Sequence, residues 1–140
     1  MSAMPKPGGF ADVSYEEALR RARGLVPVLR ERAAGAEMDR VMPEETQADL
    51  HGTGLLRVLQ PKRWGGMEFD FVAYVDFSEE LARGCASTGW TAGNLLIHHW
   101  MLALYDERAQ QESCHGVLLF ISSITLSRAS PRSQPKRSFR

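Results

Sequence analysis

The sequence predicts an all-α fold that is followed by one short strand and a disordered basic tail. A capping box, formed by Ser14 and Glu17, opens a long segment with apolar residues at helical spacing. Further helical segments follow, separated by Gly and Pro. Before Val117 no stretch has the pattern of a strand, whereas "VLLFISSIT" at 117–125 could form one.

The length and composition of the chain indicate one cytoplasmic domain. Its 140 residues suffice for a real core, and its apolar and charged fractions, 44% and 24%, are those of soluble globular proteins. Residues 1–13 form an expected flexible N-terminus, with Pro and Gly where a secretory signal would be apolar. No run approaches the roughly 20 apolar residues that span a bilayer, so no membrane partner is expected.

The charge distribution sets the C-terminal tail apart. All 17 acidic residues lie at or before Glu112, where the chain has 12 basic residues and a net charge of −5. Residues 113–140 have five Lys or Arg and no acidic residue. Such a tail can bind nucleic acid, but this one is rich in Ser, Pro and Arg without apolar periodicity. We therefore expect a disordered tail and no nucleic-acid partner.

The first half of the chain predicts two helices. The first covers "SYEEALRRARGLVPVLRERAAGAE" at 14–37, and Gly24 and Pro27 are expected to kink or divide it. The second begins near Pro43, with acidic residues in its first turn, and a glycine of "HGTG" at 51–54 ends it.

The second half predicts a connection and three more helices. The segment "LLRVLQPKRWGGMEFD" at 55–70 is a non-helical connection, broken by Pro and by a Gly-Gly pair. Asp70 is the expected N-cap of a third helix that runs to about Arg83. The fourth helix covers about 87–104, and the short helix "DERAQQE" at 106–112 follows it.

Several site patterns are missing from the sequence. It has no Gly-rich phosphate loop, no HExxH motif and no nucleophile elbow. Two cysteines give neither a disulfide framework nor the spacing of metal ligands. His98 and His99 are adjacent, about 100° apart on a helix, so they cannot both face one metal ion. No metal site is expected.

The fourth helix carries polar and aromatic residues beyond what packing requires. Trp90, Asn94, Ile97 and Met101 lie on one stripe, and His98 lies about 80° round from Trp90. The stripe therefore has an amide in an apolar setting, and a buried amide needs partners.

Two interpretations of this helix remain open from the residues alone. In the first, Trp90 and Trp100 belong to the core and one histidine is an ordinary helix residue. In the second, the helix is a wall of a binding site: Ser87 and Thr88 cap it and offer polar groups at its positive end. A histidine there could bond a phenol or move a proton near neutral pH.

The segment "PEETQADLHGTGLLRVLQPKRWGGMEFD" at 43–70 resembles the N-terminal helical domain of the acyl-CoA dehydrogenase superfamily. Members have a helix, a Thr-Gly-Leu turn, an apolar stretch ending in Pro, and an aromatic-Gly-Gly step. Within the superfamily, "LARGCASTGWTAGNLLIHHWMLALYDERAQQE" at 81–112 resembles the oxygenase component of two-component flavin-dependent phenol hydroxylases. The resemblance implies an acyl-CoA dehydrogenase-like helical domain over residues 14–112.

The resemblance also implies roles for individual residues. Trp90 would lie against the flavin, and His98 would contact the phenol hydroxyl as the catalytic residue. In the family, Ser and backbone groups of an "ISSSY"-like strand also meet the flavin. This chain keeps part of that pattern at 121–123, so Ser123 and Thr125 are further expected flavin contacts.

The cofactor and partners follow from the same resemblance. Such oxygenases use reduced FMN or FAD, supplied by a separate flavin reductase, and O₂ to hydroxylate a phenol ortho to its hydroxyl group. The expected partners are that reductase and a small phenol, with a homotetramer at full length.

Relatives in this family continue with a β-barrel domain and a C-terminal four-helix bundle. Because the family pattern and the acidic residues both vanish after Glu112, we interpret residues 113–140 as an aberrant or truncated end of a fragment. Two alternatives stay open: an acyl-CoA dehydrogenase-like flavoenzyme, and a non-catalytic helical fragment that binds a partner.

Overall fold

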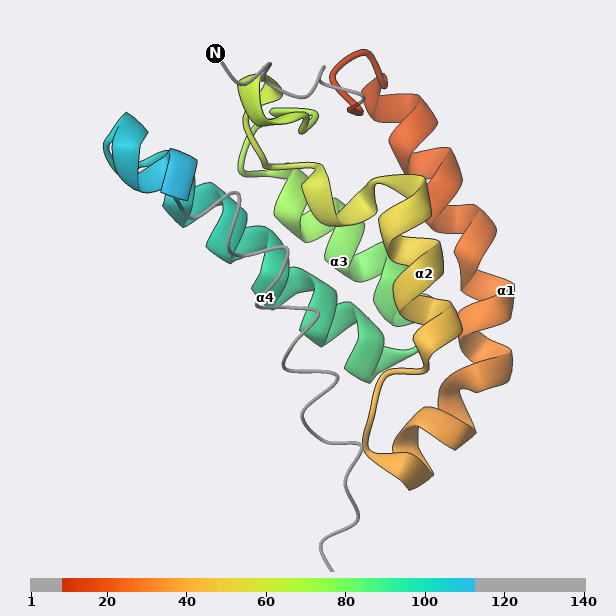
Figure 1. Cartoon of the computed structure of the whole chain (residues 1–140). Helices are drawn as coiled ribbons and strands as arrows, with labels where there is room; N and C mark the ends of the chain where they lie inside the picture. Colours follow the sequence, from red (N-terminus) through yellow and green to blue (C-terminus); the bar gives the residue numbers. More distant parts are fainter. Residues whose placement is uncertain (1–8, 113–140) are drawn as a thin grey trace, which may run out of the picture. The chain divides into compact units, whose positions relative to one another are not determined.

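The computed structural model describes residues 9–112, which form helices and turns without a strand (Figure 1). The all-α prediction is therefore confirmed for these residues, whereas the predicted strand and tail lie outside them. The elements are, in order, α1 (Tyr15–Asp39), α2 (Glu44–Thr53), the short 3-10 helices η1 (Leu55–Arg57) and η2 (Lys62–Trp64), α3 (Ala73–Gly84) and α4 (Ala86–Ala103). Residues up to Tyr105 form one compact unit, and the predicted last helix is present at 107–112 in a second unit.

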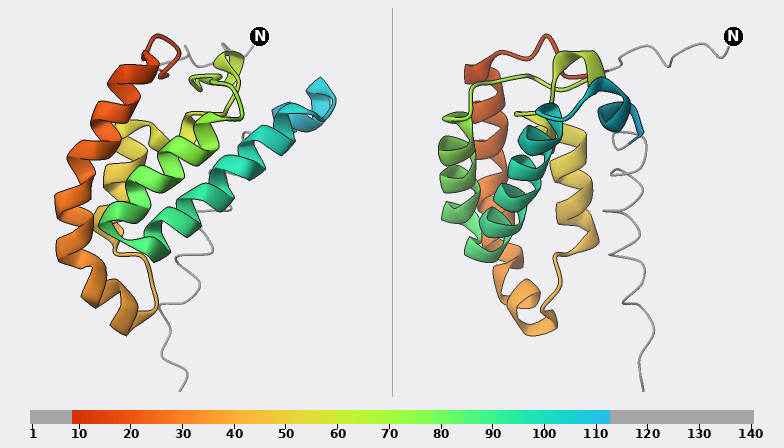
Figure 2. Two further views of the ribbon diagram at one scale, coloured as in Figure 1. Left: turned by 180° about the vertical axis from the view of Figure 1, so that it is seen from behind. Right: turned by 90° about the vertical axis from the view of Figure 1, so that its left-hand side faces the viewer.

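Within the first unit, α3 is the central helix. It packs against α1 on one side and α4 on the other, while α2 and η1 bridge between α1 and α4 (Figure 2). The aromatic and aliphatic core gathers around α3 and includes Phe77, Leu81, Leu29, Leu50, Leu55, Met67 and Leu96. Burial of such side chains contributes roughly 1.5–3 kcal/mol each. The position of α4 therefore depends chiefly on its contact with α3.

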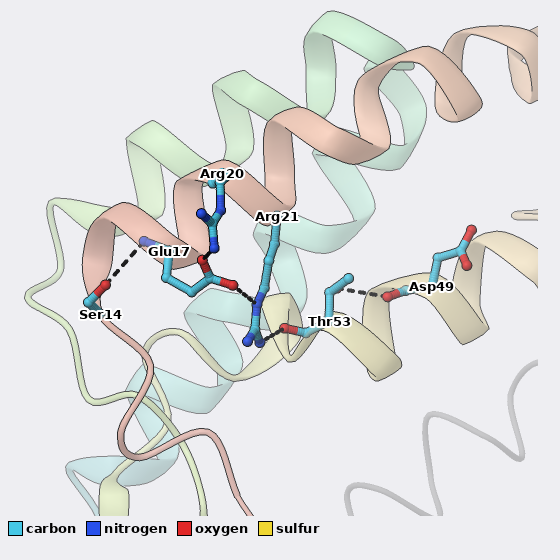
Figure 3. A network of polar contacts seen from close by, with 6 residues as sticks. All are labelled: Ser14, Glu17, Arg20, Arg21, Asp49 and Thr53. Carbon is cyan, nitrogen blue, oxygen red and sulfur yellow. Dashed lines mark hydrogen bonds and ion pairs between the residues drawn. The ribbon is translucent and has the colours of Figure 1, made fainter.

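The predicted capping box opens α1, but only half of it forms. The backbone N–H of Glu17 donates to the Ser14 hydroxyl over 3.2 Å. The Glu17 carboxylate turns instead to Arg20 and Arg21, and its bond with Arg21 is the main reason that the pKa of Glu17 lies below its usual range. Arg21 also donates to the carbonyl of Thr53 over 3.0 Å, which ties α1 to the end of α2 (Figure 3).

Pro27 does not divide α1, which runs through it as one helix of 25 residues. Proline removes one backbone donor and crowds the preceding turn. Pro27 is exposed, so water can bond the carbonyl that it leaves free, and core residues Ala22 and Leu29 anchor the helix on both sides. Of the two expected effects, a kink or a division, the division is therefore wrong, because tertiary packing holds the helix together.

The connection from α2 to α3 is more ordered than its composition suggested. Gly54 ends α2 in the left-handed conformation, as one of the two glycines was predicted to do. The two 3-10 helices follow, and Gly66 then passes so close to Gln60 that a Cβ at position 66 would lie 2.0 Å from the Gln60 carbonyl oxygen. Only glycine permits this approach.

The third helix begins later than predicted, and Asp70 is not its N-cap. The first helical residue is Ala73, and no side chain caps it. Asp70 instead accepts the N–H of Ala73 with its backbone carbonyl, over 2.9 Å, in a turn that precedes the helix. The predicted end near Arg83 agrees with the observed end at Gly84.

A hydrogen bond between Tyr15 and Asp76 joins the start of α1 to α3. The Tyr15 ring also packs against Phe69 and Phe77, with ring centroids 5.1 Å and 5.6 Å away. Burial, and next the bond to the carboxylate, raise the pKa of Tyr15 to about 12. The folded chain thus keeps this proton at a pH where the unfolded chain loses it.

The pH dependence of unfolding tests this contact. Because the folded pKa is raised, the stabilisation is complete below about pH 10 and is lost as the pH rises towards 12. We expect the urea midpoint of the wild-type chain to fall more steeply between about pH 9 and about pH 11 than that of Tyr15→Phe, which keeps the ring packing. Equal slopes would contradict this assignment.

Candidate functional site

The start of α4 is held by its own first turn. Cys85 is the N-cap in an extended conformation and α4 begins at Ala86, so the prediction that Ser87 and Thr88 cap the helix is wrong. Burial raises the pKa of the Cys85 thiol, but hydrogen bonds from the side chains and backbone of Ser87 and Thr88 outweigh it and lower the pKa. The sulfur lies 3.2 Å from the Ser87 hydroxyl.

Small residues bring α4 close to α3. A Cβ on Gly89 would lie 2.7 Å from the Cβ of Ala82, and one on Gly93 would lie 2.9 Å from the hydroxyl of Ser78. These glycines belong to the inner face of α4, whose buried members are Thr88, Gly89, Ala92, Gly93, Leu96 and His99. The close approach leaves no room for large side chains between the helices, so these lie on other faces of α4.

The outer face of α4 consists of Trp90, Asn94, Ile97, His98 and Met101. Trp90 is 74% exposed and Met101 42% exposed. His98 is also exposed, and Asn94 and Ile97 are half-buried. The core interpretation is therefore wrong for Trp90. It holds in part for Trp100, which is half-buried with its ring 4.7 Å from that of Phe71.

Two hydrogen bonds organise the polar part of this face. The Asn94 amide donates to the carbonyl of Trp90 over 3.0 Å, which answers the need for a partner. The Nδ1 atom of His98 lies 2.6 Å from the carbonyl oxygen of Asn94. A carbonyl can only accept, so Nδ1 carries a proton in this contact. In the neutral ring, Nε2 then keeps its lone pair as an acceptor.

The two adjacent histidines face opposite environments. His98 lies on the exposed surface, whereas His99 is 6% exposed. Among residues 9–112 no group of three His, Cys, Asp or Glu side chains could hold a metal ion.

Two cavities beside α4 are lined by residues other than Trp90 and His98. One, of about 380 Å³, lies between the end of α1 and the first turns of α4 and is lined by Arg40, Ser87 and Thr91 among others. Another, of about 800 Å³, is lined by Phe69, Phe71 and Trp100 with charged neighbours. Trp90, His98 and Met101 of the outer face are instead exposed. Phe69 and Phe71, which line the second cavity, were not among the expected site residues, although "EFDF" could have indicated an aromatic cluster.

The other expected flavin contacts, Ser123 and Thr125, lie outside the described residues, as does the strand predicted at 117–125. Of the predicted site residues, the structure therefore places Trp90 and His98, and it puts both on one face of one helix. No helix in residues 9–112 is both long enough and apolar enough to cross a membrane.

A comparison with protein families assigns this helical fold to a known class. The family profile described as "Acyl-CoA dehydrogenase, N-terminal domain" matches residues 17–115. The match covers more than half of the chain, so the chain belongs to the acyl-CoA dehydrogenase family. This finding confirms the resemblance that the turn and the Gly-Gly step had indicated.

Individual relatives show which members of this family the chain resembles. The chain is 38% identical over 94 residues to "Flavin-dependent monooxygenase, oxygenase subunit HsaA" of Rhodococcus jostii, covering 67% of this chain and 25% of that protein. It is 34% identical over 112 residues to the oxygenase component of the FADH(2)-dependent resorcinol hydroxylase of a Rhizobium strain, covering 80% and 27%.

A solved structure agrees with these sequences. The crystal structure of 3-HSA hydroxylase from Rhodococcus sp. RHA1 matches with a TM-score of 0.67 and 37% identity, over 71% of this chain and 26% of that one. The chain therefore spans about a quarter of the length of the curated relatives it matches. Its likeness is to the oxygenase components of flavin-dependent monooxygenases.

Proposed function

We propose that the chain supplies the N-terminal helical wall of a flavin-dependent oxygenase that hydroxylates a phenol. The observation that carries the proposal is the outer face of α4, where Trp90 and His98 lie exposed at the two positions that the family resemblance assigns to flavin and phenol. The relatives' descriptions as flavin-dependent monooxygenase and resorcinol hydroxylase support it.

The reaction takes reduced flavin, O₂ and a phenol to oxidised flavin, water and a ring-hydroxylated phenol. Bound flavin supplies the redox chemistry, and the protein supplies position and electrostatics. A separate flavin reductase would deliver reduced FMN or FAD. Ser123 and Thr125 are the further flavin contacts that we propose, and the whole enzyme would be a cytoplasmic homotetramer.

Trp90 fits the role of a flavin platform. Its indole is mostly exposed although the inner face of α4 packs closely against α3, and it lies on the same face as Ile97 and Met101. An aromatic plane of this size stacks well on another flat ring system. Ile97 and Met101 would exclude water from the reacting centre, which favours hydroxylation over release of H₂O₂.

His98 fits the role of a phenol-binding group. It lies two turns from Trp90, about 12 Å along the helix axis, which leaves space for a ring between them. Its Nδ1 atom donates to the Asn94 carbonyl, so Nε2 can accept the hydrogen bond of a phenol hydroxyl. Accepting that proton in part raises the electron density of the ring at the ortho carbon, as hydroxylation requires.

A chimera tests the proposal. Residues 9–112 would replace the matching segment of the Rhodococcus 3-HSA hydroxylase, which contributes the remaining domains. With reduced flavin, O₂ and the host's own phenol, we expect hydroxylated product, and quenching of tryptophan fluorescence by reduced flavin plus phenol. A folded chimera that is quenched only by an acyl-CoA would instead favour the dehydrogenase alternative.

A further inference from the structure

His99 is buried on the inner face of α4, which packs against the 3-10 helix η1. Its ring hydrogen-bonds to the backbone of Leu56, in a contact that favours a proton on the ring. The other ring nitrogen, Nδ1, is buried and has no hydrogen-bond partner in the described part of the chain. A backbone group that favours a proton on the ring is an acceptor, so the Leu56 carbonyl accepts this hydrogen bond. Since Nδ1 has no partner, Nε2 is the donor and carries the proton of the neutral ring, and Nδ1 carries none.

The surroundings of His99 disfavour a positive charge. Burial is the largest cause that lowers its pKa below the ordinary value of 6.5. The charged and titratable groups that act on it are Arg57 of η1, His51 of α2 and His98 on α4 itself, and each lowers the pKa further. The bond to Leu56 opposes these effects but does not overcome them.

Protonation would place the new N–H where it cannot be accommodated. The proton would go to Nδ1, which has no acceptor, and would add a charge beside Arg57. A buried donor without an acceptor is unfavourable, and a buried charge is more so. The ring must then leave its site or η1 must separate from α4.

We propose that neutral His99 is a positioning residue that fixes the rotation of α4 against η1, and with it the direction of Trp90 and His98. Successive helical residues differ by about 100°, so an inward His99 obliges His98 to face outward. The inference rests on the proposed function for the roles of Trp90 and His98. Protonation of His99 would release the helix, so the outer face is ordered near neutral pH and loosens as the pH falls through the pKa of His99, which lies below the ordinary value.

An NMR titration of the full 140-residue chain tests this proposal. Imidazole signals of each histidine and indole N–H signals of each tryptophan would be followed from about pH 8 to about pH 4. We expect His99 to titrate below 6.5, and the indole signals of Trp90 and Trp100 to shift with the midpoint of His99. Titration of His99 at or above 6.5, or indole signals that follow His51 instead, would overturn the proposal.

Two variants separate positioning from simple packing. His99→Gln keeps an amide N–H near the place of Nε2 but cannot titrate, so the indole signals should keep their neutral-pH positions and lose the acid transition. His99→Leu should shift them at every pH, whereas the control His51→Gln should retain the transition. If the indole signals of His99→Gln still shifted at acid pH, the proposal would be overturned. If that variant does not fold, the titration of the wild-type chain tests the proposal by itself.

The outcome is separable from that of the proposed function. A chimera that fails to bind flavin would leave the titration of His99 and the indole shifts unchanged. Conversely, a chimera that hydroxylates its phenol while His99 titrates normally would keep the proposed function and remove this inference.

Discussion

Gly89→Ala is expected to destabilise the chain by about 3 kcal/mol, because the added methyl group forces two closely packed helices apart. The new Cβ would lie 2.7 Å from both the Cβ and the backbone nitrogen of Ala82, so no side-chain rotation can relieve the overlap. Urea unfolding followed by circular dichroism would measure the loss. Since α4 must shift, the outer face should also move.

Gly24→Ala is the matched control for this substitution. Gly24 lies in the exposed part of α1, and a Cβ there meets nothing within 4 Å. Alanine should therefore stabilise the helix by about 0.5–1 kcal/mol, which is the ordinary benefit over glycine. If both variants changed stability in the same direction, the contact of Gly89 with Ala82 would not set the distance between α3 and α4.

His98→Ala in the chimera is expected to slow phenol hydroxylation by about 10²–10⁴-fold, the range for loss of a proton-accepting group. More of the O₂ consumed should appear as H₂O₂, since the phenol is no longer held and activated. Binding of reduced flavin should change little, because Trp90 is untouched. Product yield, peroxide yield and flavin binding would be measured on the same preparation.

The control for His98→Ala is Glu79→Gln, which alters an exposed residue of α3 that pairs with Arg83. It should leave product and peroxide yields at the level of the unmodified chimera. Loss of flavin binding in His98→Ala, with the remaining turnovers still coupled, would show that His98 serves the flavin rather than the phenol.

Local sequence patterns correctly predicted helix ends that depend on one contact between residues close in sequence. Ser14 accepts the N–H of Glu17 as a capping box requires, and Gly54 ends α2 as a left-handed glycine. Pro27 does not divide α1 and Asp70 does not cap α3, because packing against α3 decides the first and a preceding turn decides the second. Such contacts involve residues distant in sequence and leave no local pattern.

The direction in which α4 faces could not be predicted from periodicity. Apolar residues occur all round this helix, so a hydrophobic stripe does not identify its buried side. The glycines at 89 and 93 contribute to it, since they allow a close approach to α3 and leave Trp90 outside. Resemblance to a family selected Trp90 and His98, and the structure adds that His99 lies inside.

The single residue between α3 and α4 has a consequence for the order of folding. Cys85 alone connects the two helices, so closing this hairpin costs little chain entropy. The docking of α1 on α3 closes a segment several times longer and comes at a greater entropic cost. The hairpin of α3 and α4, which carries Trp90 and His98, is therefore the part of the chain that can fold first, and α1 can then pack against it.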